Sequence, residues 1–154
     1  MERTIAKLTL PFYQIYWRVT KPETTRVRVL LIHNDHILLV KHLGKKYWNI
    51  PSGMVEKGES LYTALMRELK EELGISVCTI TRKLGVYRQV TRSRNDTVHV
   101  FVATVPQKIP LHLEWEINAA RWYGIDMLPV PVQEGARRRI VEYKEGRRDV
   151  VTLW

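Results

Sequence analysis

The sequence predicts an α+β domain in which helices cover a mixed β-sheet, giving a layered α/β/α arrangement. Two observations support this fold class: strand-like segments outnumber helical ones, and one helical segment is central while the other is near the C-terminus. A length of 154 residues and a hydrophobic content of 45% suit one core. We therefore expect a single domain over residues 1–154, with residues 1–23 as an N-terminal extension.

The first predicted element is a β-hairpin. β-branched and aliphatic residues run from Thr24 to His33, and a second such run begins at Ile37. Asn34 and Asp35 between them are typical turn residues, so the two runs should pair. A break at Pro51-Ser52-Gly53 then follows a short aromatic stretch.

The next element, from Ser60 to Leu73, is a predicted helix, because Ser60 is a suitable N-cap and Gly74 stands where a helix would stop. Its apolar stripe should face the core. The stripe consists of Leu61, Tyr62, Leu65, Met66, Leu69 and Leu73. Strands are predicted at residues 83–90, 97–105 and 120–125, and a second helix over residues 132–145.

Charge and cysteine content limit the possible partners. The net charge of +9 favours anions, which fits phosphorylated substrates and nucleic acid equally well. A single cysteine, Cys78, excludes an intrachain disulfide and a cysteine-rich zinc site, and suggests a reducing cytoplasm. Charged residues interrupt the N-terminal segment, so we expect no signal peptide and no membrane anchor there.

Three carboxylates gather beside the apolar stripe of the predicted central helix. At about 100° per residue, Glu68, Glu71 and Glu72 fall within roughly 100° of each other. Glu68 repels both of the others along the helix, and only Arg67 forms an attractive pair, with Glu71. If these acids formed an ordinary solvated face of the helix, too few positive side chains would lie beside them to offset their repulsion. Clustered carboxylate oxygens are what a hard divalent cation such as Mg²⁺ or Mn²⁺ requires, so the pattern favours a metal site.

The segment from Gly53 to Ile75 resembles the Nudix box, G-x5-E-x7-R-E-U-x-E-E-x-G-U, where U is a large aliphatic residue. All nine fixed positions are filled without insertion: Gly53, Glu59, Arg67, Glu68, Leu69, Glu71, Glu72, Gly74 and Ile75. The resemblance to Nudix hydrolases implies an α/β/α sandwich with the box helix and a C-terminal helix packed on a mixed sheet. It also implies metal-dependent hydrolysis of a phosphoanhydride in a nucleoside diphosphate linked to another moiety, or in a related nucleotide.

The resemblance also implies roles for the box residues. Glu71 and Glu72 match the family's metal ligands, with Mg²⁺ or Mn²⁺ as the expected ion. Glu68 matches a residue that is a ligand or the base for the attacking water. Arg67 matches a residue that orients the carboxylates, and Glu59 matches a supporting carboxylate at the start of the helix.

The loop before the helix supplies one more implied ligand. The carbonyl of Gly53 matches a backbone metal ligand of the family. Ser52 stands where many members have glycine. We expect the loop to tolerate this change, because Gly53 is the specified position.

Substrate contacts lie outside the box and are predicted from residue type. Candidates for phosphate contact are Arg28, Lys41 and His42. Candidates for stacking on a base are Tyr47, Trp48 and Tyr87. Each has an ordinary alternative: Trp48 as a core residue or loop anchor, and His42 as a surface histidine.

A fourth acid is expected from a later part of the chain. Glu116 is the first candidate, Glu114 the second and Asp96 the third. Their ordinary alternative is a solvated loop charge. Either Glu68 or one of these acids, such as Glu116, would be the catalytic base.

Other functions stay open at this point. One is a non-catalytic Nudix-fold module that binds a nucleotide or RNA, motivated by the charge and by Arg88, Arg92 and Arg94. Another is a pyrophosphohydrolase of RNA 5′ ends or inositol pyrophosphates. The expected partner is a small nucleotide or polyphosphate, with nucleic acid possible but not favoured, and the chain is expected to be a monomer or homodimer.

Overall fold

A computed structural model describes residues 22–91 and 94–154, so the predicted extension, apart from its last two residues, and Arg92 lie outside the described residues. The strands are β1 (Glu23–His33), β2 (His36–His42), β3 (Ser52–Met54), β4 (Thr79–Val90), β5 (Asn95–Thr104), β6 (Ile117–Gly124) and β7 (Val150–Leu153). The helices are α2 (Leu61–Leu73) and α3 (Glu134–Lys144).

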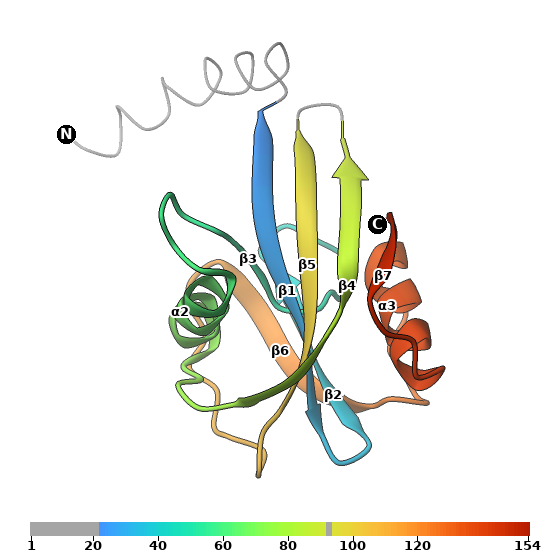
Figure 1. Cartoon of the computed structure of the whole chain (residues 1–154). Coiled ribbons are helices and arrows are strands. Elements are labelled where there is room, and N and C mark those ends of the chain that lie inside the picture. Colours follow the sequence, from blue (N-terminus) through green and yellow to red (C-terminus); the bar gives the residue numbers. More distant parts are fainter. Residues whose placement is uncertain (1–21, 92–93) are drawn as a thin grey trace, which may run out of the picture.

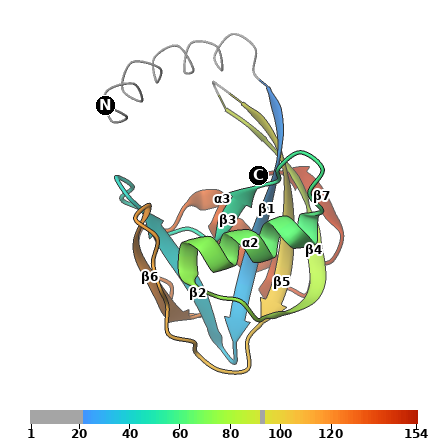
Figure 2. The same cartoon turned by 90° about the vertical axis from the view of Figure 1, so that its left-hand side faces the viewer.

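The strands form one mixed sheet between the two helices (Figure 1). Its order is β6-β2-β1-β5-β4-β7, and β3 pairs with β1 outside this path. β1 is parallel to β5 and β4 is parallel to β7, while the other pairings are antiparallel. Figure 2 shows α2 lying across one face of the sheet. The predicted α/β/α fold class is confirmed.

Alternation along β1 gives the sheet two buried faces. Val27, Val29 and Leu31 pack into the core under α2. Leu30 and Ile32 pack into the core that includes Ile140 of α3 and Trp154. A strand that is buried on both faces has a nearly continuous apolar sequence, as β1 does from Val29 to Ile32.

The caps of α2 are as predicted. The Ser60 hydroxyl accepts a hydrogen bond from the Thr63 amide at 3.0 Å, and Gly74 adopts a left-handed conformation with φ of 71°. The apolar stripe differs from the prediction at Tyr62, whose side chain is 59% exposed, whereas Ala64 is buried. The buried face of α2 is therefore rotated toward its carboxylates.

Two strands were not predicted, and both are short. β3 has three residues, includes Gly53 and follows Pro51, so its sequence is typical of a turn. β7 has four residues. Among the described residues, no helix is long and apolar enough to cross a membrane.

Candidate active site

The carboxylates of α2 are partly covered and are not all alike. Glu68 and Glu72 fall between Ala64 and Leu65 in angular order around the helix, inside its covered face. Their side chains are 17% and 13% exposed, whereas Glu71 is 58% exposed. The structure therefore keeps two carboxylates at the edge of the core, where they are poorly solvated.

Arg67 joins the acids of the box. Its Nε and Nη2 atoms donate to the two carboxylate oxygens of Glu59 at 2.9 and 3.0 Å. Its Nη1 atom donates to Glu68 Oε1 at 3.0 Å and to Glu71 Oε2 at 3.2 Å, and Nη2 also donates to the Met54 carbonyl at 2.9 Å. This guanidinium fixes the helix, its preceding loop and β3 relative to one another.

The hydrogen bonds of Arg67 also shift the pKa values of its partners. Donation from Arg67 holds the pKa of Glu59 below its ordinary value, helped by the amide of Glu56, which donates to Glu59 at 3.0 Å. The bond to Glu59 in turn raises the pKa of Arg67. The pair therefore stays ionised at neutral pH and acts as a fixed support.

Glycine is required at residue 53 because Glu68 approaches β3 closely. A Cβ atom on Gly53 would lie 1.9 Å from both Cδ and Cγ of Glu68, so any side chain there would displace the Glu68 carboxyl group from this position. Burial raises the pKa of Glu68, the Arg67 hydrogen bond opposes this, and the charges of Glu72 and Glu71 add to the rise. Glu68 is thus a carboxyl group whose environment favours taking up a proton.

The end of β2 and the loop before β6 meet the C-terminal half of α2. His42 Nε2 lies 3.6 Å from Glu72 Oε1. The Leu43 amide donates to the Glu116 carbonyl at 2.8 Å, and the Glu114 amide donates to the Glu72 carbonyl at 3.1 Å. The loop thus carries the side chains of Glu114 and Glu116, both exposed, beside the box helix.

The third candidate for a fourth acid is in a different environment. Asp96 lies on β5, is only 2% exposed and accepts a hydrogen bond from the Thr24 hydroxyl. Asp96 is therefore a buried strand residue and not a loop acid, and its carboxylate is already used in a hydrogen bond inside the sheet.

The acidic edge of α2 suits a hard divalent cation. Within residues 22–91 and 94–154, no three histidine, cysteine or acidic side chains already form a closed ion site. Arg67 occupies oxygens of Glu68 and Glu71 instead. Mg²⁺ normally uses one or two carboxylates together with water and substrate phosphates, so it needs no such closed site. A bound cation would relieve the mutual repulsion of Glu68, Glu71 and Glu72.

The structure places the phosphate candidates at different sites. His42 lies beside Glu72, as described above, and Lys41 lies over the ring of Trp48, with Nζ 4.7 Å from its centroid. Arg28 is on the α3 side of β1, 6% exposed and 4.0 Å above the ring centroid of Trp154. Only His42 directly contacts a box carboxylate.

Two of the stacking candidates are core residues. Trp48 is 6% exposed and packs edge-on against Tyr123 at 5.1 Å. Tyr87 is fully buried, and its hydroxyl donates to Glu142 at 2.8 Å. Their rings are enclosed by the core, so the expectation that either stacks on a base is corrected here. Tyr47, at 36% exposed, is accessible.

Sequence reasoning missed Arg26 and the amide partners of Arg28. Arg28 donates to Asn49 Oδ1 at 3.2 Å and to Gln89 Oε1 at 3.3 Å. Arg26 is two residues before Arg28 on β1 and therefore shares its face of the sheet. The spacing of two residues between Arg26 and Arg28 in a predicted strand could have indicated that both arginines lie on one face of the sheet.

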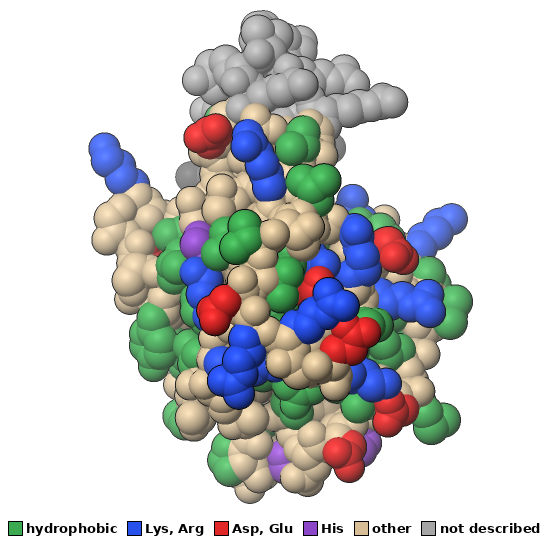
Figure 3. Space-filling view, turned by 45° about the vertical axis from the view of Figure 1, so that its right-hand side comes forward, with side chains coloured by type: hydrophobic (Ala, Val, Ile, Leu, Met, Phe, Trp, Pro, Cys, Tyr) green, Lys and Arg blue, Asp and Glu red, His purple; other side chains and the backbone are tan. Residues whose placement is uncertain are grey.

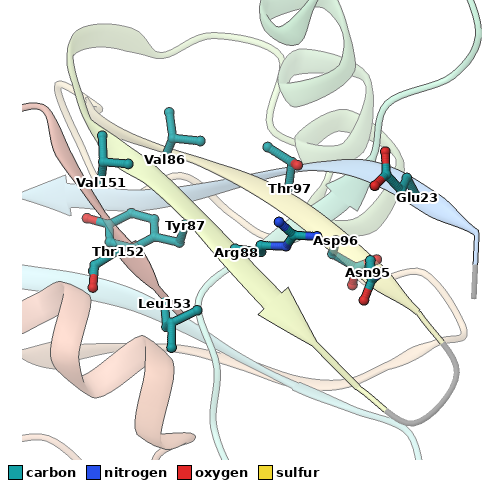
Figure 4. Close-up of a pocket in the computed structure, with 10 residues that line it drawn as sticks. All are labelled: Glu23, Val86, Tyr87, Arg88, Asn95, Asp96, Thr97, Val151, Thr152 and Leu153. Carbon is teal, nitrogen blue, oxygen red and sulfur yellow. The ribbon is translucent and has the colours of Figure 1, made fainter.

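A hollow of about 570 Å³ lies on β4, β5 and β7, away from the box (Figure 4). It is lined by Glu23, Val86, Tyr87, Arg88, Asn95, Asp96, Thr97, Val151, Thr152 and Leu153. None of these residues belongs to the box, and the lining lacks a cluster of carboxylates. Its chemistry therefore does not compete with that of the α2 edge.

Comparisons with known proteins agree on one family. The family model described as NUDIX domain matches residues 22–143. A Bacillus subtilis (strain 168) protein, provisionally named an 8-oxo-dGTP diphosphatase, is 30% identical over 79% of this chain and 80% of its own length. The NAD-capped RNA hydrolase NudC of Photorhabdus laumondii is 30% identical over 71% of this chain, which corresponds to 42% of NudC.

The solved structures show the same fold. The MutT NUDIX hydrolase from Burkholderia pseudomallei superposes with a TM-score of 0.67 at 22% identity. The match covers 79% of this chain and 98% of that protein. At this identity the likeness shows the fold alone.

Proposed function

The chain belongs to the NUDIX family of pyrophosphohydrolases, and on that premise we propose the substrate and the residues that act on it. The substrate is a nucleoside diphosphate linked to another moiety, or a related nucleotide. The reaction is hydrolysis of its phosphoanhydride with Mg²⁺ or Mn²⁺. The observation that carries the proposal is a complete box folded around Arg67, with Glu68 packed against Gly53.

The proposed ion ligands are the acids at the edge of α2 and one backbone oxygen. They are Glu68, Glu71, Glu72 and the carbonyl of Gly53. When bound, the ion lowers the pKa of water and offsets negative charge on the phosphate oxygens. Members of the family generally use divalent ions, and the hard carboxylate oxygens favour Mg²⁺ or Mn²⁺ here.

The proposed base is Glu68. Its Oε1 atom is held by Arg67 at 3.0 Å, which leaves Oε2 to take a proton from the attacking water. The water oxygen bonds to one phosphorus, the bridging P–O bond breaks, and the leaving phosphate keeps that electron pair. Two phosphate-bearing fragments result. Glu116, on the loop beside α2, is the alternative base.

Neighbouring residues position the reacting groups. Arg67 and Glu59 are positioning residues, because their paired hydrogen bonds fix the orientation of Glu68 and Glu71. We propose that His42, which lies beside Glu72, contacts a phosphate of the substrate together with its sequence neighbour Lys41. We assign the whole of residues 1–154 to one domain acting in a reducing cytoplasm as a monomer or homodimer.

A substrate panel tests the proposal. Nucleoside triphosphates, nucleotide sugars, dinucleotides and capped RNA are incubated with the protein and Mg²⁺, and phosphate-bearing products are separated. We expect turnover of at least one class, and a loss of about 100-fold or more in the Glu71→Gln, Glu72→Gln variant. Glu134→Gln, an exposed acid of α3, is the matched control. Equal rates in the double variant and the wild type would contradict the proposal.

RNA 5′ ends are a second candidate substrate, favoured by the net charge of +9 and by the likeness to NudC. Figure 3 argues against an extended RNA-tracking surface on the face that it shows, because acidic side chains lie among the Lys and Arg residues. A salt titration of RNA binding separates the two. A steep fall in affinity with salt indicates a phosphate-tracking surface, and a flat, weak response excludes it.

A further inference from the structure

We infer that Arg26 and Arg28 form a subsite for a second anionic group of the substrate, such as a phosphomonoester separate from the diphosphate that is cleaved. The enzyme would then select a doubly anionic class of nucleotide. This inference rests on the proposed function, because it names the substrate class of the same site. It depends on two arginines at the edge of the core that form no ion pair within residues 22–91 and 94–154.

Arg28 is a buried cation that forms no ion pair with an acid of the described residues. It is 6% exposed, and its hydrogen-bond partners are two neutral amide oxygens, on Asn49 and Gln89. Its Nε atom is buried and has no hydrogen-bond partner. Burial, followed by the charge of Arg26, lowers the pKa of Arg28 to about 9. A charged group in this position is costly unless something pairs with it.

Arg26 increases the excess of positive charge. Its Nε atom is also buried without a hydrogen-bond partner, and its side chain is only partly exposed. Among the described residues, neither arginine is within an ion pair. Burial lowers the pKa of both arginines, and the charge of Asp96 is the largest contribution that opposes this, although Asp96 forms no ion pair with either. Asp96 instead accepts a hydrogen bond from the Thr24 hydroxyl. The charges of the two guanidinium groups are therefore not balanced by an ion pair within the described residues.

The pairing of β1 with β3 places this subsite next to the box. Arg26 is opposite Met54, Val27 opposite Gly53, and Arg28 opposite Ser52. Glu68 packs against Gly53 from the α2 face, at the register position between the two arginines, which point to the α3 face. Among the described strands β3 pairs only with β1, so the two sites meet around this edge of the sheet. Burial lowers the pKa of Arg26 overall, and the charges of Glu68 and Glu72 partly oppose this effect. A substrate whose diphosphate lies at the acids can therefore reach the arginines with a nearby group.

The chemistry of the two arginines selects what that group is. Guanidinium groups bind phosphate and carboxylate through charge-assisted hydrogen bonds, and an anion would supply the partner that the unpaired Nε atoms lack. The ring of Trp154 at 4.0 Å holds the plane of Arg28 in a fixed orientation. A neutral group would leave the buried charge unpaired and would bind less well.

Matched substrate pairs test the inference in steady-state kinetics. NADP differs from NAD by a 2′-phosphate, and coenzyme A differs from dephospho-coenzyme A by a 3′-phosphate, so each pair keeps the same diphosphate linkage. We expect kcat/KM for the phosphorylated member of at least one pair to be about tenfold higher in the wild type. A ratio near one in both pairs overturns the inference.

Two variants separate recognition from a structural role. Arg28→Gln removes the charge, and Gln89→Glu keeps Arg28 but gives it an internal carboxylate, since Gln89 Oε1 is already 3.3 Å from its Nη2 atom. Both should bring the kcat/KM ratio close to one. Arg88→Gln is the control with the same charge change, because Arg88 is exposed at the hollow of Figure 4 on the opposite face of β4 from Gln89. A wild-type ratio in Gln89→Glu would overturn the inference.

A binding measurement distinguishes failure of the inference from failure of the proposed function. Calorimetry with the Glu71→Gln, Glu72→Gln variant compares adenosine 2′,5′-bisphosphate with adenosine 5′-monophosphate. We expect the bisphosphate to bind about tenfold more tightly, and Arg28→Gln to remove this difference. If no substrate is hydrolysed but this preference is present, the proposed function fails and the anion subsite stands. If a substrate is hydrolysed but the bisphosphate binds no more tightly than the monophosphate, the anion subsite is wrong and the proposed function stands.

Discussion

Two buried arginines lie over the ring of Trp154 and differ in their partners. Arg139 of α3 is 1% exposed and lies 5.3 Å from the ring centroid, while Arg28 of β1 is 6% exposed and lies 4.0 Å from it. Arg139 pairs with Glu142 through two contacts of 2.9 Å. The hydrogen-bond partners that Arg28 has among the described residues are amide oxygens. Two arginines at similar burial therefore differ in whether an acid pairs with them: Glu142 pairs with Arg139, and no acid of the described residues pairs with Arg28.

The difference separates a structural role from a binding role. Arg139, Glu142 and the Tyr87 hydroxyl form a closed set in which each charge has its counterpart. Breaking such a set is expensive because a buried charge is left alone. Arg28 forms no ion pair within the part of the chain that the structure describes, so the native state already includes the free-energy cost of burying its charge.

The largest effect is expected from Glu142→Gln. This change leaves Arg139 charged and buried without an anion, which should lower the free energy of unfolding by about 3 kcal/mol or more. Urea denaturation at pH 7 measures it. Glu145→Gln, which removes the acid of the exposed pair with Arg147, should cost less than about 1 kcal/mol. Similar losses in the two variants would argue against a special role for burial.

Replacing Arg139 by glutamine should lower the free energy of unfolding much more than replacing Arg28 by glutamine. The first leaves the Glu142 carboxylate unpaired and should cost about 3 kcal/mol. The second removes an uncompensated charge, which offsets the lost contact with Trp154, so it should change stability by less than about 1 kcal/mol. Thermal unfolding of both variants under one set of conditions tests this. A larger loss in Arg28→Gln would reverse the assignment of roles.

The sequence predicted the box but not the arginine subsite. Spacing alone identified the helix, its caps at Ser60 and Gly74, and the three acids, because local periodicity and capping chemistry determine these features. It also predicted the hairpin of β1 and β2. These elements depend on neighbours in the chain.

The environment of Arg28 depends on residues that are distant in sequence. Asn49, Gln89 and Trp154 meet it only because β1 lies between β3 and β5 and the C-terminal segment packs on the same face. The same distance explains the wrong expectation for Tyr87, whose partner Glu142 is 55 residues away. Whether an aromatic or charged side chain is free or paired could not be determined without the sheet order.

A smaller effect, of opposite sign, is expected from Gln89→Glu. The new carboxylate gives Arg28 the anion that Arg139 already has, so the free energy of unfolding should rise by about 1.5 kcal/mol, the lower end of the range for hydrogen bonds to charged groups. The gain should disappear in the Arg28→Gln background, which urea denaturation of the double variant measures. A gain that persists there would come from elsewhere.

The smallest effect at neutral pH is expected from Tyr87→Phe, and its pH dependence is distinctive. The change removes one hydrogen bond to Glu142, a loss of about 0.5–1 kcal/mol at pH 7. Burial, followed by the hydrogen bond to Glu142, raises the pKa of Tyr87 above its ordinary value of 10.0. The unfolded chain therefore releases this proton from about pH 10 upward while the folded protein keeps it, so the stability from Tyr87 is complete below pH 10 and is lost as pH rises further.

Phenylalanine has no such proton, and its variant should escape that loss. The wild type should lose about 1.4 kcal/mol per pH unit relative to Tyr87→Phe once the unfolded tyrosine is ionised. The two proteins should therefore become equally stable between about pH 10.1 and 10.7. Urea midpoints of both proteins at pH 8 and at this higher pH test the crossing. A constant difference would mean that Tyr87 ionises as readily in the folded protein as in the unfolded chain, and that the set of Arg139, Glu142 and Tyr87 is open to water.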